Sequence, residues 1–578
     1  FLYATNTAGA VLGTLGTVFV FVEVLGFNRT LCLAALLNFL IAISAIIISK
    51  HSAQSIITLT PISSDDSFSK QLRYWIILFV IGFCSIAMEV VWTRSFVVIL
   101  GSLVYSFATL LAIYLFSNWL GATIYCIDAK YNKSRSISSI MFLATICACL
   151  PILTSDPLIF KPLQTTLFSP WINWLVPFSI SPFAAVLGYL TPCLVNKISQ
   201  GDPAKAGKAY AANIMGCVLG PLCAGYLLLP IFGTRSALIL LTVLLGILAV
   251  NTVLQTFVLG IFLILISIFC STSWEEGGSY DWASDVVMHR DYAATTLSLN
   301  NHGCKWLFVN GQGMTSLNTI CKWMAHLPAV FHDGPPKSVL VICFGMGTSF
   351  RSALTWDSKV TVAELVPGVR DSFSYYHSDA AEVLKNPNGR IVIDDGRRFL
   401  RRTDEKYDVI LLDPPPPQES AGSSLLYTTE FYKLIKEHLR TGGILNAWSG
   451  NRDDIPYVRS FMRSIAEEFP YTRVYGSMEP NTTHWGYHVL CSESPIPDLT
   501  VDQFIARMPV KAKNDLVEWL PGQRNKSLKW TVSDVLSQQI PIEQLMVADK
   551  AYIITDDHPF NEYFHLRRTI GNQVYFAP

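Results

Sequence analysis

Residues 338–354 read SVLVICFGMGTSFRSAL, and this stretch decides the fold of the chain around it. Its first five residues form a continuous apolar run, which is typical of a buried strand in a parallel sheet. Gly345 and Gly347 then form a turn, and residues 350–354 have the composition of a helix. Glycines in such a turn let a nucleoside approach the backbone closely, and the helix N-terminus offers it unpaired N–H groups. The stretch therefore predicts an α/β fold with a ligand site at the turn.

Three more strands are predicted after the turn, and an acidic residue follows each of them. The strands and their acids are 360–363 with Glu364, 390–393 with Asp394-Asp395-Gly396, and 407–412 with Asp413. Ligands of open α/β sheets bind at the carboxyl ends of the strands, so we expect these acids to share one site. Glu364 comes about 20 residues after the turn, where a carboxylate can accept both ribose hydroxyls of a nucleoside. The alternative, that each acid only caps the next helix, stays open.

The pattern outside this core divides the chain into four parts. From Thr272 onward, strands alternate with amphipathic helices of ordinary charge, and short strands at 292–299 and 306–309 precede the main sheet. We expect a multi-spanning membrane domain at 1–271, a linker and small β-subdomain at 272–335, a Rossmann-like nucleoside-binding domain at 336–495 and a C-terminal extension at 496–578. Residues 500–550 read as mixed helices and loops to which the sequence assigns no chemistry.

The N-terminal half has the composition of a membrane protein. The chain of 578 residues is 51% hydrophobic and 15% charged, whereas a soluble chain has about 25% charged residues. A helix that spans a bilayer needs about 20 mostly apolar residues. Nine segments fit this pattern: 1–26, 31–49, 74–93, 103–127, 137–153, 171–196, 209–233, 236–250 and 253–271. We therefore expect an α-helical, multi-pass integral membrane protein with the lipid bilayer as a partner.

Charge and cysteine content exclude two other classes of partner. The chain has 43 basic and 43 acidic residues, so it has no net field that would attract nucleic acid. Its 13 cysteines share no metal-ligand spacing. The sequence therefore predicts no nucleic-acid partner, no metal and no disulfide.

The membrane half contains an internal repeat. YATNTAGAVLG at 3–13 aligns without gaps on YAANIMGCVLG at 210–220, and Gly26 then falls on Gly233. We expect the second unit at 74–251, and the first as its last two helices, with its other helices upstream of Phe1. The G-x-x-x-G pair in each copy favours close helix packing. Repeats of this kind also build secondary transporters, so a transport function stays open.

Glu89 is the clearest ionisable residue within a predicted span, where a charge is costly unless it is paired or faces a cavity. Two interpretations stay open: an intramembrane functional site, or an ion pair with Arg94 that holds the helices together. Basic residues concentrate in the loops at 50–73, 129–136 and 197–208, which predicts that these loops face the cytoplasm. Nine spans would place the C-terminal half on the opposite side. One span plus an interfacial segment within 236–271 would instead place it in the cytoplasm.

The motifs of the C-terminal half resemble those of spermidine synthases. The likeness rests on the glycine turn, Glu364, Asp395-Gly396, the Asp413 loop and LYTTEFY at 426–432, and it covers residues 290–495. The repeat, EVVWTR at 89–94 and TDDHP at 555–559 are similar to those of membrane-fused spermidine synthase-like proteins, also called fused transporter/spermidine synthases. The resemblance implies a fold shared with methyltransferases that use S-adenosylmethionine, and a cytosolic nucleoside, which favours the cytoplasmic side for the C-terminal half.

The resemblance also implies roles for individual residues. Binding of decarboxylated S-adenosylmethionine, or of a related S-adenosyl nucleoside, falls to Gly345, Gly347, Glu364, Asp395 and Gly396. Within this set Glu364 holds the ribose and Asp395 the adenine amino group. Asp413 is the catalytic acid–base residue that takes a proton from a small amine acceptor. Tyr427 lies on the loop that closes over the substrate, and the implied activity is that of a polyamine aminopropyltransferase.

Four positions depart from the family pattern. Met346 replaces the Asp that binds the aminopropyl amine, Val366 replaces the acid after the ribose Glu, Pro416 replaces a frequent second Asp, and Met314 stands near the expected Gln. A site for a polycation needs such carboxylates, because an unpaired ammonium is costly to desolvate. Three functions stay open: a membrane-bound transferase, a catalytically degenerate structural or accessory subunit of a membrane protein complex, and a transporter with a domain that senses a nucleoside or polyamine.

Overall fold

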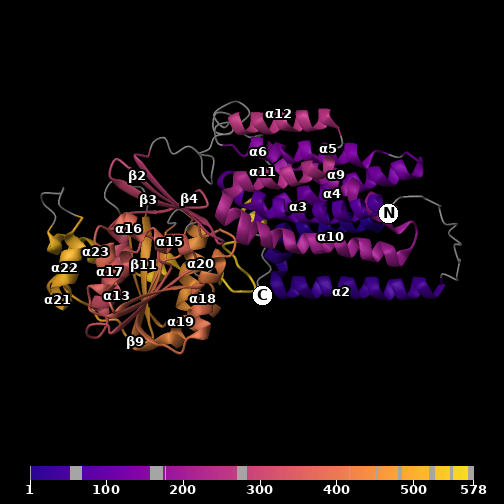
Figure 1. Ribbon diagram of the computed structural model, residues 1–578. Helices are drawn as coiled ribbons and strands as arrows, with labels where there is room; N and C mark the ends of the chain where they lie inside the picture. The colour runs from indigo at the N-terminus through magenta and orange to yellow at the C-terminus, as the bar shows by residue number, and fades with distance from the viewer. Residues whose placement is uncertain are drawn as a thin grey trace. The chain divides into compact units, whose positions relative to one another are not determined.

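The computed structural model describes residues 2–51, 68–133, 135–156, 174–175, 177–250, 252–269, 283–415, 417–450, 454–478, 485–519, 527–546 and 551–570. The chain forms two compact units, which Figure 1 shows in indigo to magenta and in rose to yellow. The first unit is Phe1–Tyr280 with Asn310–Gln312 and Tyr575–Pro578, and the second is Asp281–Val309 with Gly313–Val574. Each unit has its own core, so the two are described separately.

In the first unit, the described residues between 2 and 269 are mostly helical. Its helices are α1 (Leu2–Gly16), α2 (Val22–His51), α3 (Phe68–Leu100), α4 (Val104–Lys130), α5 (Ile137–Ala148), α6 (Leu150–Thr154), α9 (Ser181–Ser199), α10 (Pro203–Cys223), α11 (Leu229–Ala249) and α12 (Val253–Phe269). Among the described residues, five helical runs are long and apolar enough to cross a membrane: Tyr3–Ile48, Lys70–Leu100, Val104–Lys130, Ile137–Thr154 and Pro203–Ala249. Apolar helices therefore build this unit, as the sequence predicts.

Seven of the nine predicted segments fall in these five runs, because two of the runs each contain two helices. Gly26 (φ 76°, ψ 176°) is not helical, so the run Tyr3–Ile48 consists of two helices that meet at this kink, in segments 1–26 and 31–49. Gly233 (φ 73°, ψ 179°) divides the run Pro203–Ala249 in the same way, between segments 209–233 and 236–250. A positive φ of this size favours glycine, which explains the residue at both kinks. The segment at 253–271 forms the shorter helix α12, and the one at 171–196 is represented by α9.

The two aligned sequences of the repeat have the same local conformations. A π-helical turn precedes each kinked glycine, η1 (Thr17–Phe21) before Gly26 and η2 (Ala224–Leu228) before Gly233. Both turns end at the same distance from their glycine. A π-turn is rare in helices, so its recurrence at aligned positions is a structural correspondence between the two stretches.

Small residues let helices of the first unit approach each other closely. A Cβ on Gly216 would lie 2.2 Å from the Phe79 carbonyl oxygen of α3. Next to this contact, Asn213 Nδ2 donates a hydrogen bond of 2.9 Å to the Leu78 carbonyl. The aligned glycine in α1, Gly9, would meet no atom within 4 Å in the structure as described. Gly216 and Gly220 of α10 thus pack against α3, while the aligned Gly9 and Gly13 of α1 meet no described atom within 4 Å.

The second unit begins with a small antiparallel sheet. Its strands, in spatial order, are β1 (Asp285–Arg290), β2 (Thr295–Asn301), β3 (Cys304–Val309) and β4 (Gln312–Ser316). The strand predicted at 292–299 starts only at Thr295. The reason is a turn in which Asp291 Oδ1 accepts hydrogen bonds from the N–H groups of Ala293 and Ala294, at 2.7 and 2.8 Å.

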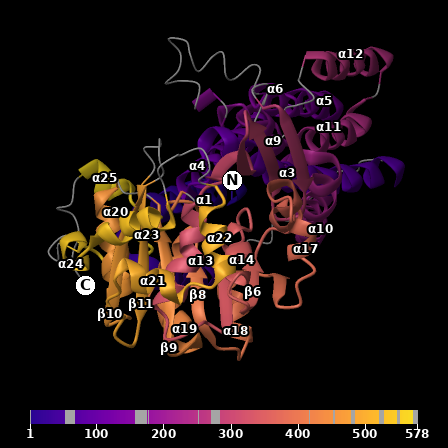
Figure 2. The same ribbon diagram turned by 90° about the vertical axis from the view of Figure 1, so that its left-hand side faces the viewer.

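The main sheet of the second unit has eight strands in the order β12-β10-β11-β9-β8-β5-β6-β7. They are β5 (Ser338–Ile342), β6 (Lys359–Glu364), β7 (Gly389–Ile393), β8 (Tyr407–Leu412), β9 (Leu439–Ser449), β10 (Tyr471–Met478), β11 (Trp485–Ser492) and β12 (Gln539–Ile540). Strands β9, β8, β5, β6 and β7 are parallel, and β10 and β11 add an antiparallel edge. Figure 2 shows these strands side by side with helices around them.

Helices cover the main sheet and extend beyond it. They are α13 (Ile320–Phe331), α14 (Thr348–Leu354), α15 (Pro367–Asp371), α16 (Phe373–Tyr376), α17 (Ala380–Val383), α18 (Gly396–Arg402), α19 (Thr429–His438), α20 (Ile455–Ala466), α21 (Val501–Arg507), α22 (Val510–Val517), α23 (Leu528–Ser537), α24 (Ile542–Leu545) and α25 (His565–Ile570). The side chains of β8 are all buried, as expected for a central parallel strand. The predicted strands 338–342 and 407–412 are confirmed at both ends.

Candidate functional site

The parallel register brings the ends of four strands to one edge of the sheet. Ile342 at the end of β5 pairs with Ala363 on one side and with Leu412 on the other. On the next strand, Glu364 pairs with Ile393. The residues that follow these strands therefore meet there, as the spacing predicts. Cys343 lies at the centre, because its thiol is within electrostatic range of the carboxylates of Glu364, Asp413 and Asp395.

The glycine turn leaves room for a ligand at one of its two glycines. Cys343, Gly345 and Gly347 all have a positive φ, of 72°, 55° and 77°. A Cβ on Gly347 would lie 2.4 Å from the Phe373 ring, so glycine is required there by packing as well as by conformation. A Cβ on Gly345 would meet no described atom within 4 Å. The open side of the turn at Gly345 fits the approach of a nucleoside to the backbone.

Glu364 is buried at the end of β6 and holds the turn in place. Its Oε2 accepts a hydrogen bond of 2.7 Å from the N–H of Phe344, and its Oε1 one of 2.8 Å from the N–H of Val366. Burial raises the pKa of this carboxyl, and the N–H donors of Val366 and Phe344 oppose that rise. A carboxylate oxygen has more than one acceptor position, so hydroxyls of a ribose can still bind here.

Asp395 and its neighbours begin α18. Asp395 Oδ1 accepts a hydrogen bond of 2.8 Å from the Arg398 N–H, so this side chain caps the helix. Asp394 instead forms an ion pair with Arg398. A Cβ on Gly396 would lie 2.5 Å from Ile342 Cγ2, so the helix can start this close to β5 only with glycine. The prediction that a strand-end acid caps the next helix is therefore confirmed for Asp395. The cap uses Oδ1, so Oδ2 could accept a hydrogen bond from a ligand.

Asp413 directly follows β8 at this edge of the sheet. It is half-buried, and within the described part of the chain its carboxylate accepts no hydrogen bond and forms no ion pair. Burial raises its pKa to about 7, because the charged form is poorly solvated. A carboxyl group that titrates near neutral pH can both take up and release a proton at the site.

Tyr427 lies beside this edge and is buried. Its ring packs edge-on against Tyr457 and Phe461, with centroids 5.8 and 6.0 Å away. Its hydroxyl is within electrostatic range of the Cys343 thiol. Tyr427 follows the short helix η3 (Ser423–Leu426), in the segment between β8 and α19. The structure thus brings Tyr427 to the same end of the sheet as Asp413.

The positions that depart from the family pattern are largely apolar in the structure. Met346 is buried in a cluster that includes Phe344 and Phe350. Val366 and Met314 are partly buried against the same cluster. Pro416 lies outside the described residues. The apolar side chain of Met346 thus packs in the core of the second unit.

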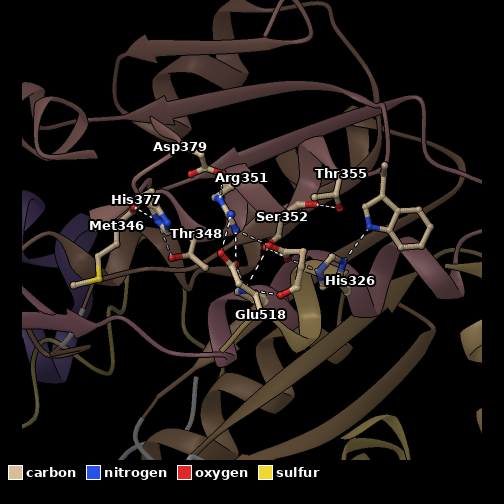
Figure 3. Close-up of polar contacts among 12 residues, drawn as sticks. His326, Met346, Thr348, Arg351, Ser352, Thr355, His377, Asp379 and Glu518 are labelled. Carbon is tan, nitrogen blue, oxygen red and sulfur yellow. Dashed lines mark hydrogen bonds and ion pairs between the residues drawn. The ribbon is translucent and has the colours of Figure 1, made fainter. Parts of the chain in front are cut away.

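A polar network behind the turn was not predicted from the sequence (Figure 3). His377 Nε2 donates a hydrogen bond of 3.1 Å to the Met346 carbonyl, and burial together with Arg351 lowers the pKa of His377 to about 4. Arg351 of α14 binds Asp379 and Glu518, each at 2.8 Å. Glu518 comes from the C-terminal extension, so this extension supports the helix that follows the glycine turn. No local pattern could have revealed pairs so distant in sequence.

Lys322 completes this network. Its side chain is fully buried, and its Nζ lies 2.7 Å from Glu518 Oε2 and 3.7 Å from the centre of the Trp519 ring. Asp515 accepts hydrogen bonds from Arg351 and Ser352, both at 2.7 Å. All these charges have partners, which is the usual condition for burying them. The cluster therefore joins α13 and α14 to the C-terminal extension.

Glu89 belongs to the first unit and takes no part in this site. Its carboxylate is within electrostatic range of the Tyr114 hydroxyl and the Cys217 thiol. No ion pair joins Glu89 to Arg94 in the described residues, so the structure does not show the pairing interpretation. Among those same residues, no group of three or more His, Cys, Asp or Glu side chains could hold a metal ion.

Comparison with known proteins connects this geometry to a family. Residues 319–499 match the model of the spermine/spermidine synthase domain. Polyamine aminopropyltransferase 2 of Pseudomonas aeruginosa is 27% identical over 170 residues, which are 28% of this chain and 48% of that protein. The polyamine aminopropyltransferase of Thermotoga maritima is 32% identical over 155 residues, which are 26% of this chain and 52% of that protein. The chain thus spans about half the length of the curated relatives it matches.

Among solved structures, the spermidine synthase of Thermotoga maritima aligns with a TM-score of 0.37 and 23% sequence identity, over 46% of this chain and 88% of that one. The family match falls on the unit that contains Glu364, Asp395 and Asp413. The C-terminal part of the chain therefore carries a spermidine synthase-like domain.

Proposed function

We propose that this protein is a membrane-bound transferase that moves an aminopropyl group from decarboxylated S-adenosylmethionine, or a related S-adenosyl nucleoside, to a small amine. The observation that carries the proposal is the meeting of Glu364, Asp395 and Asp413 at one sheet edge beside an open glycine turn. All three lie within the residues that match the spermine/spermidine synthase domain.

In this reaction the lone pair of the amine attacks the methylene carbon bonded to the sulfonium. A C–N bond forms while the C–S bond breaks, and its electrons neutralise the sulfur of the departing methylthioadenosine. The new ammonium must then lose one proton, and Asp413 is the acceptor. With a pKa of about 7, Asp413 is partly ionised at neutral pH, which a general base requires. Glu364 and Asp395 hold the nucleoside so that its methylene faces the amine.

Attachment to a bilayer is the second part of the proposal. It is supported by the five helical runs that are long and apolar enough to cross a membrane. A multi-pass first unit of this kind would hold the transferase at the membrane surface, and the cytosolic origin of the nucleoside favours the cytoplasmic side.

One observation favours a different function. Met346 places an apolar side chain under the turn, and Cys343 occupies a backbone conformation suited to glycine. A site that has lost its carboxylates in this way would bind a polycation poorly. The second candidate is therefore a catalytically degenerate domain that serves as an accessory subunit of a membrane complex.

Calorimetric titration of the full chain in detergent with decarboxylated S-adenosylmethionine, S-adenosylmethionine and methylthioadenosine separates these candidates. We expect saturable binding of at least one nucleoside, weakened by about tenfold or more in Glu364→Ala and Asp395→Ala, since each loses a hydrogen bond to a charged group. Asp395→Ala also removes a helix cap, so Thr500→Ala, which removes the cap of α21, is the matched control.

Binding by the wild type and by Thr500→Ala would justify a screen of amine acceptors, with Asp413→Asn as the inactive variant. If a folded chain binds none of the three nucleosides, the transferase proposal is wrong, and the accessory-subunit candidate takes its place.

A further inference from the structure

The segment from Thr555 to Glu562, here called the C-terminal strap, contacts the loop that leads from Asp413 to α19. This loop, here called the 417–428 loop, carries Tyr427. The strap lies outside residues 319–499, which match the family domain, so the match assigns it no role.

One end of the strap holds the middle of the loop. Glu562 Oε2 accepts hydrogen bonds from the Gly422 N–H at 3.2 Å and from Ser424 Oγ at 2.5 Å. Beside it, Asn561 Nδ2 donates a hydrogen bond of 2.7 Å to the Gln418 carbonyl. Glu562 is only 8% exposed, so water competes little for these bonds.

The other end of the strap binds the helix that starts at the expected adenine site. The two carboxylate oxygens of Asp556 accept hydrogen bonds from both terminal nitrogens of Arg397, one of them at 2.7 Å. Arg397 follows Asp395 and Gly396 directly in α18, and it also donates a hydrogen bond of 3.5 Å to the Leu425 carbonyl of the loop. Arg397 thus connects the loop, the strap and the nucleoside side of the edge.

The residue that precedes the strap, Ile554, is held by hydrogen bonds to two helices. Ile554 is fully buried, and its N–H donates a hydrogen bond of 2.8 Å to Ser464 Oγ of α20. Its carbonyl accepts one of 2.9 Å from the N–H of Thr429, the first residue of α19. The strap is therefore anchored to α19 and α20, which cover the sheet, next to the point where it contacts the loop.

From these contacts we propose that the strap is a clamp that fixes the 417–428 loop beside Asp413, with Glu562 and Asp556 as its positioning residues. Ordering a loop costs conformational entropy for each residue, and the buried, charge-assisted hydrogen bonds from the strap offset that cost. The inference deepens the proposed function, because the loop borders the side of the edge where the amine would bind.

Hydrogen–deuterium exchange of the full chain in detergent tests the clamp without any assumption about activity. In Glu562→Ala we expect amides of residues 417–428 to exchange about tenfold faster than in the wild type, because a charged hydrogen-bond acceptor is lost. Glu562→Gln keeps a side-chain oxygen at this position and should restore most of the protection. Glu543→Ala, at an exposed position of α24, is the matched control and should leave the loop unchanged. Amides of β5 and β8 report whether each variant is folded.

Equal loop exchange in wild type and Glu562→Ala, with β5 and β8 protected, would overturn the clamp, and so would a failure of Glu562→Gln to restore protection. If instead β5 and β8 lose protection together with the loop, Glu562 supports the whole fold and the clamp is equally overturned. Asp556→Ala gives a second reading in a variant that leaves Glu562 intact, and there too the loop must exchange faster.

Titration with methylthioadenosine distinguishes a failure of the clamp from a failure of the proposed transferase function. If no nucleoside binds, the transferase proposal fails while loop exchange still decides the clamp. If the chain does transfer aminopropyl groups, Glu562→Ala should raise KM for the amine and leave the affinity for methylthioadenosine within threefold of the wild type.

Discussion

Asp413 is half-buried, and its carboxylate accepts no hydrogen bond from the described residues, so we expect its ionisation to affect stability. Its pKa rises from 3.8 to about 7 in the folded chain. Between these values the folded chain keeps a proton that the unfolded chain has released, so Asp413 destabilises the fold increasingly as pH rises from 4 to 7. Asp413→Asn removes the charge. We therefore expect this variant to unfold a few °C above the wild type at pH 8, and at nearly the same temperature at pH 4.

Thermal unfolding in detergent at pH 4, 6 and 8, followed by tryptophan fluorescence, measures this difference in unfolding temperature. Glu543→Gln is the control, because it also removes an acid but at an exposed position. A difference between wild type and Asp413→Asn that does not change with pH would contradict the raised pKa and, with it, the role of Asp413 as a base.

At the scale of elements, the close contact between α10 and α3 depends on the missing side chain of Gly216. A Cβ there would lie 2.2 Å from a backbone oxygen of α3, and backbone cannot move aside as a side chain can. We expect Gly216→Ala to destabilise the first unit by about 1–3 kcal/mol, as overpacking does in other cores. Gly9→Ala changes the aligned glycine, whose added Cβ would meet no described atom within 4 Å. It should cost little or nothing, or even stabilise α1.

Unfolding of both variants by titration with a denaturing detergent compares them under the same conditions. Equal loss of stability in Gly216→Ala and Gly9→Ala would show that helix conformation, rather than the contact with α3, decides the effect.

The elements that could be predicted are those whose signal is local. Apolar runs such as 407–412 identify buried strands because a central parallel strand is covered on both faces. The meeting of the strand-end acids follows from parallel topology alone. Polar residues such as Asn28 and Arg29 divide the predicted segments 1–26 and 31–49 close to Gly26. The structure divides the helices at Gly26 itself, because its backbone is not helical.

Contacts between segments far apart in the sequence have no local sequence pattern that would predict them. Glu562 and Ser424 are 138 residues apart in sequence, and Arg351 and Asp515 are 164 apart. An isolated acidic residue in a mixed helical segment reads as a solvated surface charge until its partner is known. The support of the site by the C-terminal extension was therefore not predictable from the pattern, although TDDHP at 555–559 was noticed for its resemblance.

At the scale of the whole molecule, the surface of the first unit differs from that of a soluble protein. Large apolar side chains are exposed along its helices, among them Leu12, Leu31, Ile47 and Leu254. Soluble proteins rarely expose apolar surface continuously over long helices, whereas lipid covers it without cost. The second unit has its own core and an eight-stranded sheet. Proteolytic cleavage of the chain between the two units therefore tests the proposal that the first unit lies in a membrane.

We expect the intact chain to stay with membranes after an alkaline carbonate wash. With a protease site inserted between Glu276 and Gly277, cleavage should release a water-soluble C-terminal fragment and leave the apolar helices in the pellet. In sealed vesicles with the cytoplasmic face outward, protease added outside should release this fragment, while vesicles of the opposite orientation should protect it. Release only from the second kind of vesicle would place the domain away from its nucleoside and contradict the cytoplasmic side. A chain that carbonate washes from the membrane would contradict the spanning helices themselves.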